Sequence, residues 1–339
     1  MKKLMTLVLT SLLMLSLFTG ALAAEKITAY GAYQEDELKF MFDAFKAETG
    51  IEVFYVRLSA SELFTRIQAE AENPQVSLWF GTSVDTLNVA AAEGYLEAYT
   101  PNGIENIPES LRDPNGFWTA HSLSVLCFAS NDEWLAESGV NPPESWAELL
   151  DEKYKEEVVV AHPGTSGVAY AWLSSLVSLM GEDEAIAYMQ KLDKNIVQYT
   201  KGGAAPARMA GLGESGVGLC WSCDALNTID AGYKLTLTYP AEGTPFEITG
   251  MALVKNGPAD EMDNARKYMD WAISKETQKM YVDKYYRLPV VEGVEIPAAL
   301  TAFSDLNTIT VDRAFASANR ARLIERFESD VRGSENVLK

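Results

Sequence analysis

Cysteine and histidine are scarce in this chain of 339 residues, and acidic side chains outnumber basic ones. Three cysteines cannot form a disulfide framework that holds the fold together, because at most one bridge is possible. The only histidines, His121 and His162, exclude a histidine-rich zinc site and constrain any serine, histidine and aspartate triad. A net charge of −20 repels nucleic acid and anionic lipid. These absences argue against nucleic-acid binding and against most hydrolases.

The first 23 residues have the pattern of a secretory signal peptide. Two lysines follow the initial methionine, an apolar run covers residues 4–18, and the Ala-Leu-Ala cleavage pattern ends at Ala23. The apolar run is too short to span a membrane. No cysteine lies near the cleavage pattern, so a lipid anchor on cysteine is not expected. The sequence therefore predicts a soluble, periplasmic mature protein.

Alternating strand and helix patterns predict an α/β architecture. Residues 27–30 are typical of a strand, and the helix after them ends at Gly50. Its apolar residues recur at helical spacing and are Leu38, Met41, Phe42 and Phe45. A capping box at Ser59 and Glu62 begins another helix, and a third strand is expected at residues 76–80, followed by a turn at residues 81–83 that leads into a helix. This β-α-β-α-β-α order indicates a parallel sheet covered by helices.

The chain is long enough for two hydrophobic cores, and a long apolar strand at residues 118–129 is expected to cross between two lobes. A strand near residues 251–255 would bring the chain back. We therefore predict two lobes with discontinuous boundaries. Lobe 1 takes residues 24–121 and about 251–292, and lobe 2 takes about 122–250 and 293–339.

Six segments carry a resemblance to a known family: SLWFGTS from Ser77, SWAELLDEKY from Ser145, HPGTSG from His162, GED from Gly181, YTKGGAAP from Tyr199 and EGTPFEITGMALVK from Glu242. In order and spacing they resemble periplasmic binding proteins of the ferric-iron class and its sugar-phosphate and phosphonate relatives. The resemblance implies a two-lobed periplasmic-binding-protein fold, each lobe a central sheet flanked by helices, with ligand in the interlobe cleft. It also implies a monomeric component of an ABC importer, with a permease and an ATPase as partners and with no cofactor or catalysis.

Several candidate ligand-binding residues lie where strands lead into helices, the place where ligands of open α/β sheets bind. They are small or hydroxyl-bearing residues or an aromatic, namely Tyr33, Thr82, Ser83, Thr165, Ser166, Gly167 and Gly203. The resemblance implies that Thr165, Ser166 and Gly167 hold phosphate or phosphonate oxygens. Serine, threonine and glycine are also ordinary helix caps and turn residues, so a structural role is the alternative.

Two carboxylates, Asp224 and Glu247, form the second group of candidates. The resemblance implies that they grip sugar hydroxyls, a role that suits carboxylate oxygens as acceptors. The chain departs from the sugar-phosphate pattern at Cys223, which stands in place of a histidine. A sugar phosphate and an aminoalkylphosphonate therefore both stay open. Trp221 is a candidate for stacking on the ligand, and a helix cap is the alternative role for Asp224.

The sequence also bears on three other functions. Ferric binding in the class uses a pair of adjacent tyrosines near positions 221–224, which this chain lacks there, and Tyr285 with Tyr286 is interpreted as packing. Acidic and tryptophan residues leave a polyamine ligand open. Cys220 and Cys223 form a CxxC pattern typical of thiol oxidoreductases, although strand alternation would separate the two thiols. The sequence predicts a binding protein for a small anionic organic solute, and not an enzyme.

Overall fold

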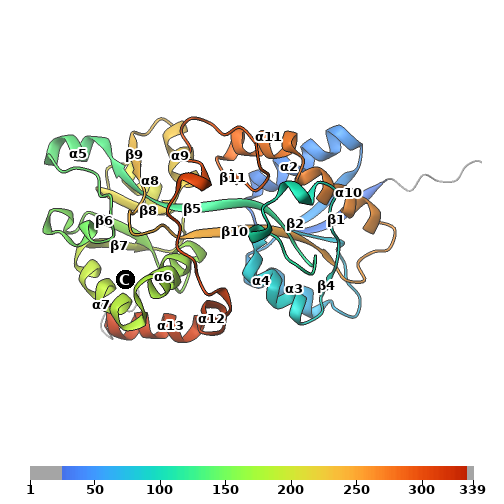
Figure 1. Ribbon diagram of the computed structural model, residues 1–339, viewed down its shortest axis with the longest axis horizontal. Helices are drawn as coiled ribbons and strands as arrows, with labels where there is room; N and C mark the ends of the chain where they lie inside the picture. The colour runs from blue at the N-terminus through green and yellow to red at the C-terminus, as the bar shows by residue number, and fades with distance from the viewer. Residues whose placement is uncertain (1–24, 334–339) are drawn as a thin grey trace, which may run out of the picture.

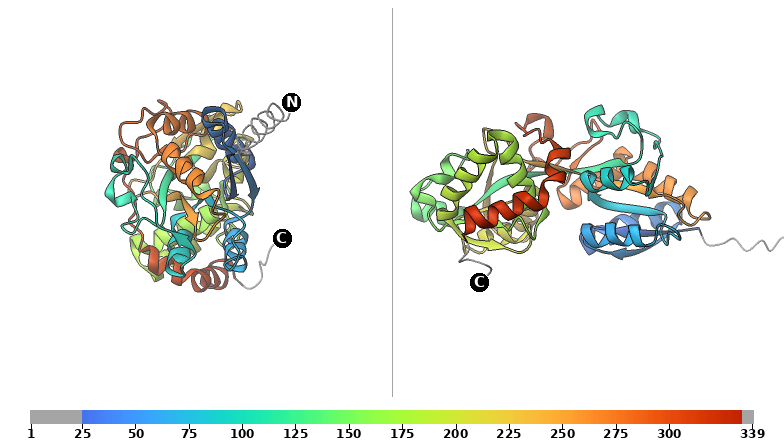
Figure 2. Two further views of the ribbon diagram at one scale, coloured as in Figure 1. Left: turned by 90° about the vertical axis from the view of Figure 1, so that its right-hand side faces the viewer. Right: turned by 90° about the horizontal axis from the view of Figure 1, so that it is seen from below.

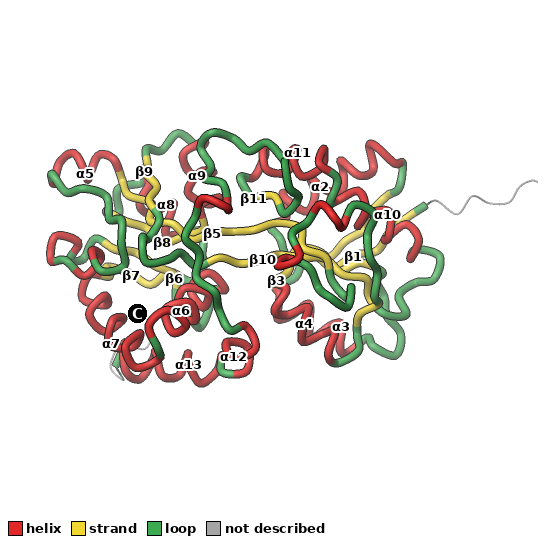
Figure 3. Tube along the Cα trace, viewed as in Figure 1, coloured by secondary structure: helices red, strands yellow, loops and turns green. Residues whose placement is uncertain are grey.

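The computed structural model describes residues 25–333 as two α/β lobes joined by long strands (Figure 1). The signal peptide predicted at residues 1–23 lies outside the described residues. Figure 3 shows the two connecting strands as yellow tubes that run from one lobe into the other. In the described part of the chain, no helix combines the length and the apolar character needed to cross a membrane.

The strands of the described chain are β1 (Lys26–Gly31), β2 (Glu52–Arg57), β3 (Leu78–Ser83), β4 (Leu96–Glu97), β5 (Thr119–Asn131), β6 (Val158–Ala161), β7 (Ile196–Thr200), β8 (Val217–Trp221), β9 (Leu235–Thr238), β10 (Phe246–Val254) and β11 (Leu288–Pro289). The α-helices are α2 (Glu35–Thr49), α3 (Ala60–Ala69), α4 (Val84–Ala92), α5 (Asp132–Ser138), α6 (Gly167–Met180), α7 (Glu182–Leu192), α8 (Ala205–Gly211), α9 (Ser222–Asp230), α10 (Met262–Ala272), α11 (Lys275–Tyr285), α12 (Arg313–Ala318) and α13 (Arg320–Arg326).

Lobe 1 is built on the strand order β2-β1-β3-β10. Strand β1 pairs in parallel with β2 and β3, as the alternating pattern predicted, and β10 runs antiparallel to β3. Gly50 ends α2 in the left-handed conformation, and the predicted capping box of Ser59 and Glu62 begins α3. Local sequence signals thus position the helices that border the junction between the lobes.

Lobe 2 is built on the strand order β5-β8-β6-β7. Strand β6 is parallel to β7 and β8, whereas β8 is antiparallel to β5. Helix α6 follows β6 through a short turn, and α9 follows β8 directly. Both helices therefore begin at the carboxyl ends of buried strands, where unpaired N–H groups are available.

The strands β5 and β10 belong to both lobes. All thirteen residues of β5 are buried, and β10 pairs with β5 from Phe246 opposite Val125 to Met251 opposite Thr119. The long apolar strand predicted at residues 118–129 is confirmed. Because both strands are continuous across the junction, any rotation of one lobe against the other must bend or twist them.

Each lobe has its own large hydrophobic cluster. The cluster of lobe 1 includes Leu38, Phe80 and Tyr268, and that of lobe 2 includes Phe128 and Trp172. Helices α12 and α13 extend along the lower edge of lobe 2, and Figure 2 shows them from below. Two separate cores agree with the two-lobed fold, while the exact lobe boundaries stay a prediction.

The end of β3 differs from the prediction. The sequence indicated a turn at residues 81–83, but Thr82 and Ser83 are the last residues of the strand. They pair with Gly250 and Thr249 of β10, which lie far away in the sequence. Pairing with β10 thus extends β3 beyond Gly81, where the sequence pattern indicated its end.

Candidate functional site

A cavity of about 610 Å³ lies between the two lobes. Its walls come from the starts of α3 and α4 in lobe 1, the start of α6 in lobe 2, the first residues of β10 and the C-terminal segment. This volume is within the usual range for small-molecule sites. Of the candidate residues, Ser83, Thr165, Gly167 and Glu247 line the cavity.

The N-terminus of α6 borders this cavity at Gly167. The N–H of Tyr170 bonds to the carbonyl of Ser166 at 3.0 Å, so the N–H groups of the three preceding residues have no helical acceptor. A Cβ atom placed on Gly167 would meet no atom within 4 Å. A ligand oxygen can therefore approach the backbone here, and the helix dipole favours a negative charge.

Most hydrogen-bond donors of the turn before α6 are already bonded to carbonyl groups of the protein. The carbonyl of His162 accepts the N–H groups of Thr165 and Ser166, both at 3.0 Å. The hydroxyl of Thr165 donates to the carbonyl of Lys201 at 3.0 Å. Thr165 lines the cavity, but both of its donors are already used within the protein.

Ser166 and Gly203 pack against each other beside this turn. Ser166 is buried and does not line the cavity. A Cβ atom on Gly203 would lie 2.4 Å from the side chain of Val168 and 3.0 Å from the hydroxyl of Ser166. Gly203 therefore allows close packing against α6. Of the predicted trio, only Gly167 both lines the cavity and has an N–H without an acceptor in the described part of the chain.

Lobe 1 contributes Ser83 from the end of β3. Its hydroxyl accepts the N–H of Asp85 at 3.4 Å and caps α4. Thr82, one residue earlier, is buried and does not line the cavity. Its hydroxyl has no hydrogen-bond partner within residues 25–333. The two neighbouring hydroxyls thus occupy different environments, because successive side chains of a strand point to opposite faces.

Glu247 enters the cavity from the start of β10, opposite Ser124 of β5. Burial is the largest cause that raises the pKa of its carboxyl, and the nearby Asp85 raises it further. Arg287, Arg313 and a hydrogen bond with Ser83 oppose this increase. A carboxyl in this position can accept hydrogen bonds from a hydroxyl or an ammonium group.

Asp224 is not brought to the same cavity. It lies in the first turn of α9, which begins at Ser222, so it is not the residue that caps the helix. Burial raises the pKa of its carboxyl to about 6, Glu37 raises it too, and Arg287 lowers it. Its place in the ligand site stays a prediction.

A polar cluster at the junction of the lobes contains Tyr33, and we call Tyr33, Glu37, Ser124 and Arg287 the hinge cluster. Arg287 binds the Glu37 carboxylate through Nε at 2.6 Å and Nη2 at 2.9 Å. Its Nη1 donates to Ser124 at 2.9 Å, and its guanidinium lies 4.8 Å from the centre of the Tyr33 ring. Tyr33 is buried, with its hydroxyl 2.7 Å from that of Ser122. Tyr33 therefore supports the junction and is not exposed in the cavity.

Trp221 and Cys223 belong to the hydrophobic cluster of lobe 2, whereas Cys220 packs with Cys127 in a separate small cluster. All three cysteines are free and buried. Burial raises the pKa of the Cys223 thiol. For Cys220, a hydrogen bond with Cys127 and burial both raise the thiol pKa. Buried thiols that stay protonated are poor nucleophiles, so a redox role for the CxxC pattern is not supported.

Sequence reasoning missed two arginines that line the cavity, Arg313 and Arg320. Arg313 lies 3.2 Å from the carboxylate of Asp85. Arg320 lies 4.2 Å from the centre of the Tyr170 ring. Arginines are frequent after residue 312 in a chain of net charge −20, and this local excess of positive charge was the available signal.

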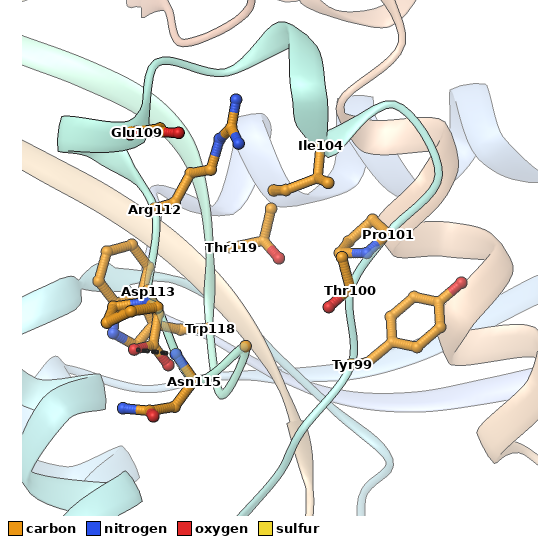
Figure 4. A pocket seen from close by; sticks show the side chains of 12 residues that line it. Tyr99, Thr100, Pro101, Ile104, Glu109, Arg112, Asp113, Asn115, Trp118 and Thr119 are labelled. Carbon is orange, nitrogen blue, oxygen red and sulfur yellow. Dashed lines mark hydrogen bonds between the residues drawn. The ribbon is translucent and has the colours of Figure 1, made fainter.

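A second pocket of about 580 Å³ lies on lobe 1 and is lined by residues of the segment from Tyr99 to Thr119 (Figure 4). None of the candidate residues lines it. Its Arg112 donates to the carbonyls of Ile107 and Glu105, and Asp113 accepts the N–H of Phe117 at 2.6 Å. Because these charged groups hold their own loop in place, the interlobe cavity is the stronger candidate.

The adjacent tyrosines that were considered for iron binding do not lie in the interlobe cavity. Tyr286 donates to Asp230 at 2.8 Å, and neither Tyr285 nor Tyr286 lines the interlobe cavity. Within residues 25–333, no group of three or more histidine, cysteine, aspartate or glutamate side chains is arranged to hold a metal ion.

Comparison with known proteins identifies one family and several relatives. The family described as bacterial extracellular solute-binding protein matches residues 80–319. Iron uptake protein A1 of Synechocystis is 24% identical, covering 84% of this chain and 81% of its own length. A periplasmic protein of Salmonella paratyphi A, named for 2-aminoethylphosphonate binding, is 27% identical over 84% of this chain and 86% of its own.

A solved structure is also similar over nearly the whole chain. It is the periplasmic binding protein AfuA from Actinobacillus pleuropneumoniae with fructose-6-phosphate bound. The TM-score is 0.80 at 30% sequence identity, and the alignment covers 91% of this chain and 98% of AfuA. The two-lobed architecture is therefore shared with a ligand-binding protein.

Proposed function

From the premise that this chain belongs to the bacterial extracellular solute-binding proteins, we propose that it binds a small organic solute carrying a phosphate or phosphonate group in the interlobe cavity. The protein acts in the periplasm as a monomer after removal of its signal peptide. It delivers the solute to an ABC permease and its ATPase, and it does not change the solute chemically.

The observation that carries this proposal is that two groups of opposite character line the same cavity. Gly167 begins α6, where a backbone N–H and the helix dipole favour an oxyanion. The carboxyl of Glu247 is suited to a hydroxyl or an ammonium group. A solute with an anionic end and a hydrogen-bond-donating end fits this arrangement, whereas a second anionic group would face Glu247.

Two relatives support the same ligand class. AfuA is described with fructose-6-phosphate bound, and the Salmonella protein is named for 2-aminoethylphosphonate. Both compounds have the polarity that the cavity favours. The iron uptake protein keeps ferric iron as the second candidate, although the adjacent tyrosines of this chain lie outside the cavity.

Closure of the two lobes accompanies binding in this proposal. The ligand would contact α4 of lobe 1 and α6 of lobe 2 at once, and the continuous strands β5 and β10 would bend to allow the rotation. Small-angle scattering with and without ligand should show a smaller radius of gyration for the complex. Unchanged scattering from a saturated protein would contradict closure.

Isothermal titration with four compounds tests the ligand class. We expect glucose-6-phosphate or 2-aminoethylphosphonate to bind, and ferric citrate and spermidine to bind weakly or not at all. Glucose and ethylamine are matched controls because they lack only the phosphorus-containing group. Tight binding of spermidine or of ferric citrate alone would show that the ligand class is wrong.

A further inference from the structure

The C-terminal segment forms a wall of the cavity in addition to the two lobes. Helix α12 and the start of α13 line it through Arg313, Ala316 and Arg320, together with neighbouring residues of the segment. Figure 1 shows α12 beside the junction, on the side of α4. None of the positions taken from the family resemblance lies in this segment.

The charged side chains that line the cavity differ in their partners. They are Asp85, Glu247, Arg313 and Arg320. Arg313 and Asp85 form an ion pair at 3.2 Å, which joins the C-terminal segment to lobe 1. Arg320 has no ion pair and no hydrogen bond to any residue in the described part of the chain; it stacks on the Tyr170 ring and interacts electrostatically with the Glu247 carboxyl.

This ring contact leaves the donors of Arg320 available. A guanidinium stacked on an aromatic ring uses its face, while its N–H groups point outward in the plane. Tyr170 lies three residues after Gly167, which places both on one face of α6. The free arginine is therefore held on the same side of α6 as the backbone N–H that borders the cavity.

Helix α13 holds Arg320 in this position. Arg322 and Arg326 both bind Glu182 of α7, at 2.7 Å and 2.6 Å. Leu323 is buried in the core of lobe 2, and the hydroxyl of Tyr170 donates to the carbonyl of Ala316. The backbone that carries Arg320 is thus fixed on both sides of that residue.

We propose, on the basis of the proposed function, that Arg320 binds the phosphate or phosphonate group of the solute together with the N-terminus of α6. Arginine presents planar, paired donors that match a phosphate group. Arg320 and Glu247, the two lining charges without an ion-pair partner, then select a solute with one anionic group and one hydroxyl or ammonium group. The C-terminal segment thereby determines specificity as well as completing the fold.

Titration of the unmodified chain and its R320Q, R320K and R322Q variants tests this role. R320Q should raise the dissociation constant of the phosphorus-containing ligand by about tenfold to a hundredfold, as expected for a charge-assisted hydrogen bond. R320K keeps the positive charge but not the paired donors, so its affinity for the ligand should fall by less than that of R320Q. R322Q measures the effect of loosening α13, because Arg322 lies on the same helix, pairs with Glu182 and does not line the cavity; its loss of affinity should be smaller than that of R320Q.

The outcomes separate this inference from the proposed function. If R320Q binds the ligand as tightly as the unmodified chain, the role of Arg320 is wrong while the proposed function stands. If no phosphate or phosphonate compound binds the unmodified chain, the proposed function fails and the inference fails with it. Equal losses of ligand affinity in R320Q and R322Q, with lowered thermal stability in both variants, would assign Arg320 a structural role and would also overturn the inference.

Discussion

Two arginines stack on tyrosine rings near the junction of the lobes, and they differ in every other contact. The side chain of Arg287 in the hinge cluster is 14% exposed, and three of its nitrogens bind Glu37 and Ser124. Arg320 makes no ion pair or hydrogen bond within residues 25–333, and its partners there are the ring of Tyr170 and, at longer range, the Glu247 carboxyl. Both residues carry the same guanidinium group. The number of its N–H donors that are hydrogen-bonded within the protein therefore distinguishes an arginine that supports the fold from one that is available to a ligand.

The largest effect on stability is expected from R287Q. The side chain of Glu37 is only 6% exposed, and the substitution would leave its carboxylate buried without its cationic partner. Breaking a buried pair in this way costs about 3–5 kcal/mol. Urea denaturation monitored by circular dichroism measures the change. A double variant, R287M with E37L, should recover much of the loss, and a small effect of R287Q alone would contradict the supporting role of Arg287.

D224N should change the pH dependence of stability next to the hinge cluster. Burial raises the pKa of Asp224 from 3.8 to about 6, so the folded state holds this proton more tightly than the unfolded chain. The protonated Asp224 carboxyl therefore contributes its full share to the stability of the fold below about pH 4, and this share is lost as the pH rises through about 6. At pH 8, D224N should be more stable than the unmodified chain by at most about 3 kcal/mol.

Free energies of unfolding measured from pH 4 to pH 8 would check this expectation. The difference between D224N and the unmodified chain should grow as the pH rises to about 6 and then level off. A constant difference would mean that Asp224 keeps an ordinary pKa. Adding R287Q should strengthen the effect, because Arg287 lowers the pKa of Asp224.

A smaller effect is expected from E182Q, which weakens the attachment of α13. Hydrogen bonds from Arg322 hold the pKa of Glu182 at about 2, and those from Arg326 lower it as well. This stabilisation is present above about pH 4.5 and is lost as the pH falls toward 2. Because both arginines are partly exposed, we expect a cost of about 1 kcal/mol near neutral pH.

The same variant links the anchor of α13 to binding. E182Q should weaken ligand binding only while Arg320 is present, since it acts by loosening the helix that carries that residue. A double-mutant cycle with R320Q measures this coupling. Fully additive losses in affinity would show that Glu182 does not position Arg320.

The smallest effect on stability is expected from R320Q. No described residue makes an ion pair or a hydrogen bond with Arg320, so the free energy of unfolding should change by no more than about 0.5 kcal/mol. Thermal unfolding without ligand provides the measurement. A loss comparable with that of R287Q would remove the contrast between the two arginines.

Local signals in the sequence predicted much of the architecture. The capping box at Ser59 and Glu62 and the terminating Gly50 depend on hydrogen bonds and dihedral angles within a few residues, and both are confirmed. The long strand β5 was recognisable because every residue in it is buried. Gly167 and Glu247 could be proposed because each lies in a segment that resembles the family.

The composition of the site depended on contacts that no local pattern contains. The hydroxyl of Thr165 is used by the carbonyl of Lys201, and Trp221 is enclosed in the core of lobe 2. Arg320 follows Gly167 by more than a hundred residues, yet packing of α13 on α7 brings it beside the start of α6. By itself the sequence determined the type of fold and the elements through short-range bonding and burial patterns, and it indicated the class of protein through its resemblance to a family. Only the tertiary structure decided which polar groups are satisfied internally and which stay free for a ligand, because that depends on partners supplied by distant parts of the chain.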